Sequence, residues 1–535
     1  MPAAPEPLLD VADMQGNILA GFNKDHQLLV ALNIAEVAGT RRWLARVWPQ
    51  ISTLTQVLQF NSLFRSMRAQ TGSEPVGLVA SWFNIAFSHD AIVKLTSTNE
   101  ADALPGRAFR AGLSAQRARG LADPVPEGER DPTAKWVVGS AGSAPDIFVI
   151  IASDRPTELE ALALRVLPNP SQDGVDAPRM VWKELGETLP NLPGHEHFGW
   201  KDGVSQPGVR GLVSQNPEVL LTPRILQSAP DGEVEFAHPG QPLVWPGNFV
   251  LGYPHTDRND GKPLGPAPLA FDWFRNGSFL VFRRLNQNVA GFAQFLEQQA
   301  ASLAKTPGFA GLTPMQLGSL LVGRWPSGAP LSRMPLADDP VLAADRDANN
   351  DFLFASDSPL PNFLPGHSVA SFPLAFEATK GPLCPHAAHI FKVNPRDHTT
   401  DVGPDFDTLT RRILRRGSPF GPPLISPLGG DDGVERGLHF LCYQASIEDQ
   451  FEFLQKRWAN TELGPTPGGH DIIIGQTKSM ERTMEVPAIV RGQQPEVVTT
   501  PTQWVTPTGG GYFFAPSVSA IRDRFASGLP NEHGG

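Results

Sequence analysis

Short apolar segments, each followed by a helical pattern, recur along this chain and restrict its fold more than any other feature. The run DIFVIIAS (146–153) is typical of a strand buried on both faces. The next segment, TELEALALRVL (157–167), has its apolar residues at helical spacing. Strands and helices that alternate in this way predict a mixed α+β core.

The first part of the chain contains three further strand patterns. These are QLLVALNI (27–34), SWFNIAFS (81–88) and RMVWKEL (179–185). Helical patterns follow the first two of them. Together they predict a four-stranded α+β unit over about residues 20–190.

A similar alternation returns in the second part. Strands are expected at SFLVFRRL (278–285) and LHFLCYQA (438–445), and each is followed by an amphipathic helix, at 289–304 and 446–460. HIFKVNPR (389–396) lies between them, after a long Pro-rich passage. The order strand–helix–strand, found twice, is that of a ferredoxin-like unit.

The length of 535 residues is too great for one ordinary core and favours two domains. We expect an N-terminal ferredoxin-like domain over 1–270 and a C-terminal one over 271–535, each with a four-stranded antiparallel sheet and helices. The stretches 200–270 and 325–385 have loop composition, and loops of that size in a compact protein tend to be functional.

Charge and cysteine content exclude some classes of protein. The net charge is −11 without a basic cluster, which argues against nucleic acid as a partner. The two cysteines are too few for a disulfide framework. No classical signal peptide and no apolar run of ~18 residues is visible, so we expect no membrane partner and, by default, a cytoplasmic protein; export by another route stays open.

The stretch FGWKDGVSQPGVRG (198–211) contains one acid, Asp202, between Gly199 and Gly203. Such a pattern alone is more typical of a turn than of a catalytic acid, because Asp bonds its own backbone and Gly accepts positive φ.

Histidines supply two further hypotheses. A zinc site could use His195, His197, Cys384 and His386, but no CxxC or HExxH spacing supports it. A haem iron with one imidazole ligand fits better, and it needs a cation on its open face. RRILRRGSPFG (411–421) supplies arginines, of which we expect the first two to be a solvated basic helix end.

Taken in order, these segments resemble the dye-decolourising peroxidases, a haem family built from two ferredoxin-like domains. GWKDG is similar to the family's GxxDG motif. The other matching segments are DMQGNILAGFNK (13–24), CPHAAHIFKVNPR (384–396), RRGSPFG (415–421), LHFLCYQASIEDQFEFLQKRWAN (438–460) and TPTGGGYFFAPS (506–517). The resemblance implies a haem b (iron protoporphyrin IX) cofactor, held mainly by the C-terminal domain.

The resemblance also implies roles for individual residues. His389 would be the axial ligand of the iron, Asp202 the distal acid/base and Arg415 the distal cation. Arg396 would pair with a haem propionate. A carboxylate should accept a hydrogen bond from the far nitrogen of His389, and Asp471 is the candidate, with Glu448 and Glu452 behind it.

The remaining expectations concern the walls of the haem site. Leu438 and Phe440 would line its distal side, and Gly203 would let the backbone approach the porphyrin. Two positions depart from the family pattern. Phe391 stands where a basic residue is usual, which removes one expected propionate contact, and Trp200 replaces a more usual Phe.

The predicted function is a peroxidase that reduces hydrogen peroxide and oxidises dyes, phenols or other bulky one-electron donors. One carboxylate can take a proton from one peroxide oxygen and return it to the other, while an arginine stabilises the developing negative charge. The alternative is a haem-binding or haem-handling protein with little peroxidase turnover, which would need His389 and Arg396 but not Asp202 and Arg415 together.

Overall fold

A computed structural model gives the fold of residues 6–527, apart from 76, 202, 215–221, 224–226, 229–234, 238–239, 346–347, 353, 355–383, 397, 404, 491 and 501. Asp202 and the Pro-rich passage SDSPLPNFLPGHS (356–368) therefore lie outside the described residues. Among the helices that are described, none is long and apolar enough to cross a membrane.

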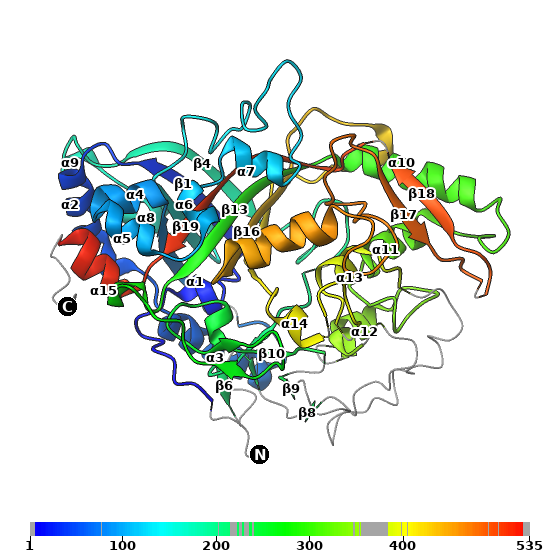
Figure 1. The fold of residues 1–535 in the computed structure, drawn as a ribbon, viewed down its shortest axis with the longest axis horizontal. Coiled ribbons are helices and arrows are strands. Elements are labelled where there is room, and N and C mark those ends of the chain that lie inside the picture. Colours follow the sequence, from blue (N-terminus) through cyan, green and yellow to red (C-terminus); the bar gives the residue numbers. More distant parts are fainter. Residues whose placement is uncertain are drawn as a thin grey trace.

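One antiparallel sheet closes into a barrel at the centre of the molecule (Figure 1). Its strand order is β13-β19-β2-β3-β1-β4-β15-β16-β14, and β13 also pairs with β16, which closes the ring. The N-terminal half supplies β1 (His26–Asn33), β2 (Ser81–Phe87), β3 (Ile147–Ser153) and β4 (Arg179–Glu187). The C-terminal half supplies β13 (Ser278–Gln287), β14 (Leu414–Arg415), β15 (Ser418–Phe420), β16 (Gly437–Gln444) and β19 (Val505–Ala515).

Both halves have the strand order of a ferredoxin-like unit. The N-terminal order is β2-β3-β1-β4. In the C-terminal half, β14 and β15 pair with β16 in one continuous register and together act as the second strand, so the order second–third–first–fourth is repeated. The predicted α+β fold with two ferredoxin-like units is confirmed.

The apolar run of β3 is explained by its position between two cores. Its alternate residues point to opposite faces of the sheet. Phe148 enters the barrel, where its ring lies 4.6 Å from that of Phe282 and 5.1 Å from that of Phe513. Val149 packs on the outer face against the helices of the N-terminal half. Because both faces are covered, no polar residue interrupts the run.

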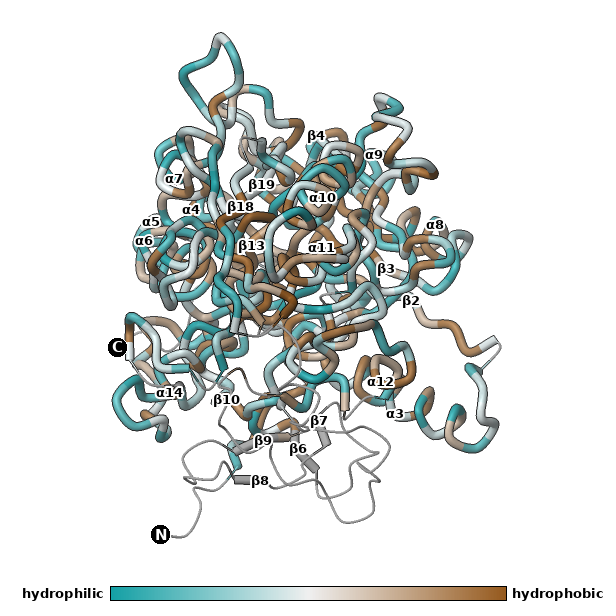
Figure 2. The backbone as a smooth tube through the Cα atoms, turned by 90° about the vertical axis from the view of Figure 1, so that its right-hand side faces the viewer, coloured by the Kyte–Doolittle hydropathy of each residue, from teal (hydrophilic) through white to brown (hydrophobic). Residues whose placement is uncertain are grey.

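Helices cover the outside of the barrel on two sides (Figure 1). The helices α2 (Val37–Val47), α4 (His89–Leu95) and α8 (Pro156–Val166) pack on the N-terminal half. The helices α10 (Val289–Leu303) and α11 (Pro314–Val322) belong to a separate core beyond the C-terminal strands. Hydrophobic stretches gather in the middle of the molecule around β13, and many outer turns are hydrophilic (Figure 2).

Some elements were absent from the sequence prediction or differ from it. The strands β14, β15 and β19 were not predicted. HIFKVNPR begins with the short helix α13 (His389–Val393), and the helix expected over 446–460 consists of two π-helical segments, η7 (Ile447–Glu452) and η8 (Leu454–Ala459). The domain boundary at 270/271 stays a prediction, because the two halves share one closed sheet.

Candidate active site

A cavity of about 630 Å³ is lined by residues from the C-terminal strands, α13 and the loop that follows Trp200. The strands contribute apolar side chains, including Leu285, Leu438 and Phe440, and α13 contributes His389. Pockets for cofactors and small molecules commonly measure about 300–1,000 Å³. The cavity is therefore of a suitable size for a cofactor.

His389 is held by a carboxylate. Its Nδ1 lies 2.7 Å from Oδ2 of Asp471, which is fully buried. The other oxygen of Asp471 accepts the backbone N–H groups of Ile473 and Ile474, each at 3.0 Å. An Asp471 carboxylate fixed in this way orients the imidazole with Nδ1 as the donor, which makes Nε2 the nitrogen that would bind a metal.

Two buried cations lie near Asp471. Lys392 donates to the carbonyl of Thr461 at 2.7 Å and to that of Gly464. Burial lowers the pKa of Lys392 to about 8, although the charge of Asp471 opposes this effect. Burial also lowers the pKa of Arg482 to about 10, again against the charge of Asp471. The carboxylate that holds His389 therefore lies in a positive environment.

Arg415 joins β14 to the loop that carries Asp202. Its Nη2 donates to the carbonyl of Ser205 at 2.7 Å. Its backbone N–H donates to the side chain of Gln206 at 3.3 Å, and the Gln206 amide returns a bond to the Arg415 carbonyl at 3.2 Å. Trp200 and Gly203, on either side of position 202, line the same cavity as Arg415.

Arg396 also lines the cavity but is extensively bonded to the protein. Its guanidinium donates to the Phe352 carbonyl at 2.7 Å and to Oδ1 of Asn350 at 2.6 Å, and it lies 3.6 Å from the centre of the Phe352 ring. Arg324 donates to the same two side chains, Asn350 and Ser205, as Arg396 does. No sequence motif could have identified Arg324 or Asn350.

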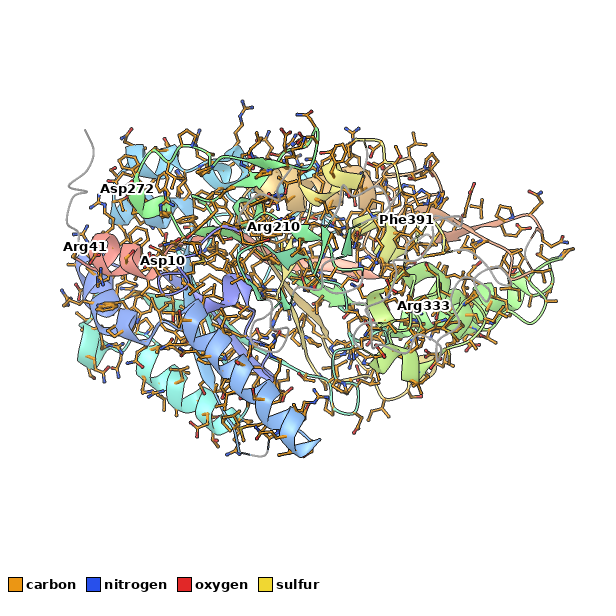
Figure 3. All side chains as sticks on the ribbon, turned by 90° about the horizontal axis from the view of Figure 1, so that it is seen from below. Asp10, Arg41, Arg210, Asp272, Arg333 and Phe391 are labelled. Atoms are coloured by element: carbon orange, nitrogen blue, oxygen red, sulfur yellow. The ribbon has the colours of Figure 1, made fainter. Side chains whose placement is uncertain are left out.

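The two departures from the family pattern have different outcomes. Phe391 is fully buried, with its ring 4.7 Å from Phe354 and 4.8 Å from His386, so it packs in the core of the C-terminal half (Figure 3). Trp200 lines the cavity, and its indole Nε1 donates to Ser319 at 3.3 Å.

Three charged residues named in the sequence analysis are bonded to other parts of the fold. Arg411 is only 6% exposed and donates to the Asp449 carbonyl at 3.1 Å, so the expected solvated position is wrong. Glu448 accepts the backbone N–H of Ala108, and Glu452 accepts from Arg117 at 2.8 Å. Both glutamates are therefore bonded elsewhere than to His389.

The side chains of the zinc hypothesis do not converge. Nε2 of His195 bonds the Pro326 carbonyl, and Nε2 of His197 bonds the Phe420 carbonyl, both at 2.8 Å. His386 stacks on Phe391. In the part of the chain that the structure describes, no group of three or more His, Cys, Asp or Glu side chains could hold a metal ion.

Comparison with known proteins assigns the chain to one family. The family model described as "DyP dimeric alpha+beta barrel domain" matches residues 13–170, and the one described as "Dyp-type peroxidase, C-terminal" matches residues 372–466. A dye-decolorizing peroxidase of Mycetinis scorodonius is 31% identical over 531 residues, which cover 96% of this chain and 87% of that protein. The chain belongs to the dye-decolourising peroxidase family.

Solved structures agree with this peroxidase over nearly its whole length. An ancestral D-type dye decolorizing peroxidase is 33% identical with a TM-score of 0.74, and the match covers 97% of this chain and 100% of that one. The peroxidase of Auricularia auricula-judae is 28% identical with a TM-score of 0.71 and the same coverage. Members of the family are haem enzymes, so the predicted class of enzyme is confirmed.

Proposed function

We propose that this peroxidase binds haem b in the 630 Å³ cavity, reduces hydrogen peroxide there and oxidises dyes, phenols or other bulky one-electron donors. One observation carries the proposal. His389, Arg396 and Arg415 line a single cavity together with Trp200 and Gly203 of the loop that carries Asp202, although they come from segments far apart in the chain.

The residues present suit a flat, largely apolar group with carboxylate substituents. Leu285, Leu438 and Phe440 supply apolar walls. A Cβ added to Gly203 would meet no protein atom within 4 Å, so the backbone leaves space beside the cavity. Arg396 would pair with a propionate. When bound, haem would supply the redox chemistry of peroxide reduction.

On the proximal side, His389 would hold the iron through Nε2. Asp471 would keep the imidazole in one tautomer and orientation and would strengthen it as a donor. Its own bonds to the N–H groups of Ile473 and Ile474 prevent the carboxylate from turning away.

On the distal side, Asp202 would take a proton from one oxygen of hydrogen peroxide and deliver it to the other, so that water leaves. Arg415 would stabilise the negative charge that develops during this transfer. The bond from Arg415 to the Ser205 carbonyl supports this pairing, because it ties the guanidinium to the loop three residues after Asp202.

The cavity reaches the surface. Its lining includes the exposed residues Asn23, Asp25, Pro193 and Gly194. Hydrogen peroxide is small enough to enter by such an opening, and reducing substrates would approach from the same side.

A visible spectrum followed by a peroxide titration tests the proposal. The purified protein should show an intense Soret band that changes on addition of peroxide. Asp202→Asn and Arg415→Leu should retain the band and slow its change at least about 100-fold. A protein without the band would overturn the haem assignment, and variants that react at the parent rate would overturn the roles of Asp202 and Arg415.

A further inference from the structure

The triplet HEH (195–197) precedes the loop that carries Asp202, and its two histidines form hydrogen bonds with separate parts of the fold. His195 bonds the Pro326 carbonyl, in the loop after α11, at 2.8 Å. His197 bonds the Phe420 carbonyl at 2.8 Å. Phe420 is the last residue of β15, which pairs with β16 in the same register as β14, the strand of Arg415. Burial lowers the pKa of His197, which favours the neutral ring that donates this single bond.

Glu196, between the two histidines, binds the loop itself. Its carboxylate accepts the backbone N–H of Phe198 at 2.7 Å and that of Trp200 at 3.1 Å. It also accepts a bond from the side-chain amide of Gln287, at the end of β13. A carboxylate with these N–H donors connects the loop to a strand of the barrel.

The backbone of the same loop closes on Glu196. The N–H of Gly199 donates to the Glu196 carbonyl at 3.0 Å, and the N–H of Glu196 donates to the Trp200 carbonyl at 3.4 Å. Gly199 has φ +94°, a left-handed conformation that disfavours other residues. Residues 196–200 therefore form one compact turn.

Trp200 fixes the far end of this turn. It is 8% exposed, and its ring lies 6.1 Å from that of Phe292. A Cβ built on Gly318 of α11 would lie 2.2 Å from the Trp200 ring, so this glycine provides the space for the indole. Beyond position 202, Ser205 and Gln206 are bonded to Arg415. The short segment that carries Asp202 is thus anchored on both sides.

We propose that Glu196 is a positioning residue that fixes the loop of Asp202 relative to Arg415. The inference rests on the proposed role of Asp202. A carboxylate suits this position because its partners at Phe198, Trp200 and Gln287 are all N–H donors, and bonds to a charged acceptor are stronger than neutral ones. Glutamine would turn an N–H group toward one of these donors, and alanine would leave all of them without this acceptor.

A double-mutant cycle on the haem-loaded protein tests the inference. Stopped-flow mixing with hydrogen peroxide gives the rate of the Soret change for the parent, Glu196→Ala, Asp202→Asn and the double variant. We expect Glu196→Ala to react about 100-fold more slowly than the parent, because a displacement of about 1 Å costs that much. In the Asp202→Asn background the same change should matter less than about threefold, since the two act as a unit.

Hydrogen exchange supplies a second measure that does not depend on turnover. Exchange in the peptide covering 196–207 should be faster in Glu196→Ala than in the parent. Glu100→Gln is the matched control, because Glu100 also accepts several bonds, from Trp273 at 3.0 Å and from Arg524, but does not line the cavity. It should leave both the exchange of this peptide and the peroxide rate unchanged. If Glu196→Ala does not fold, Glu196→Gln replaces it, with a loss of about tenfold expected.

The results separate this inference from the function on which it rests. A parent rate in Asp202→Asn would overturn the assignment of the acid. A slow Asp202→Asn together with a parent rate in the Glu196 variant would overturn only the positioning role. The positioning role would also be overturned if the Glu196 substitution slowed the reaction equally in the parent and in Asp202→Asn. Unchanged hydrogen exchange over 196–207 in the Glu196 variant would overturn it too.

Discussion

The two halves of the barrel share a strand order but differ in what their central strands carry. In the N-terminal half, β3 is apolar along nearly its whole length and packs on both faces. In the C-terminal half, β13 begins with the same kind of residues and then continues through Arg283, Arg284 and Gln287. One scaffold thus supports a closed core in one half and, in the other, a cavity wall with both apolar and charged side chains.

Ion pairs compensate the buried charges of the two arginines of β13. Arg283 lines the cavity and donates to both oxygens of Asp123 at 2.8 Å. Arg284 faces the barrel interior and pairs with Glu184 of β4 at 2.8 Å. Breaking a buried pair by removing one partner is costly, because the remaining charge stays buried. The comparison predicts that changes at the cavity lining affect chemistry, whereas changes in the N-terminal core affect stability.

The largest effect is expected for His389→Ala. Loss of the imidazole would remove the bond to the iron, so the protein should retain little haem and lose peroxidase activity. Haem content by pyridine haemochrome assay and the position of the Soret band measure the change. A variant with full haem content and the parent spectrum would place the iron ligand elsewhere.

Asp471→Asn should have the next largest effect. The amide oxygen still accepts from Nδ1, 2.7 Å away in the parent, but without a negative charge. His389 becomes a weaker donor, so we expect a higher reduction potential of the bound haem and about 10- to 100-fold lower activity. Spectroelectrochemistry gives the potential; an unchanged potential would contradict the role of the carboxylate.

Leu44→Ala tests the opposite half. Leu44 is fully buried in the core between α2 and the N-terminal strands. Truncation should lower the free energy of unfolding by about 2–5 kcal/mol. The peroxide rate per bound haem, measured below the unfolding transition, should stay within about twofold of the parent, since Leu44 itself does not line the cavity. A tenfold slower rate would end the proposed division between the halves.

The smallest effect concerns the contact between the halves. Burial opposes ionisation of Glu184, but bonds from His439 at 2.6 Å and from Arg284 outweigh it and lower the pKa to about 2. A depressed carboxyl pKa stabilises the folded state above pH ~4.5, and this stabilisation is lost as the pH falls toward 2. The temperature of thermal unfolding should therefore fall more across this pH range in the parent than in Glu184→Gln. If the unfolding temperatures of the two proteins changed with pH in parallel, the pairing of Glu184 would be contradicted.

Periodicity predicted the elements whose apolar residues follow a regular pattern of burial, and failed where close backbone contacts determine the structure. β3 and α8 lie where the pattern placed them. β19 was missed because Gly509, Gly510 and Gly511 weaken any strand prediction, yet a Cβ on Gly139 would lie 2.0 Å from the Gly510 carbonyl. The segment around Gly139 passes so close to β19 there that only residues without a side chain fit at the contact.

Sequence patterns also predicted only part of the candidate active site. Motifs located the segments of His389 and Arg415, because each carries a distinctive residue type in a fixed local order. They did not indicate that Glu196 binds Gln287 or that Arg324 and Arg396 share Ser205, since these partners are distant in sequence and common in type. Asp471 was identified only because a ligating imidazole needs an acceptor.

The closure of the barrel has a consequence for dividing the chain into fragments. The outer strands of each half are the neighbours of the other half, through Phe87 beside Phe514 and Gly186 beside Phe420. Either half produced alone would present two unpaired strand edges, which invite association with other chains. Each fragment alone would therefore tend to aggregate, whereas the two fragments together can pair their exposed edges. A split form of this enzyme should assemble only when both pieces are made in the same cell.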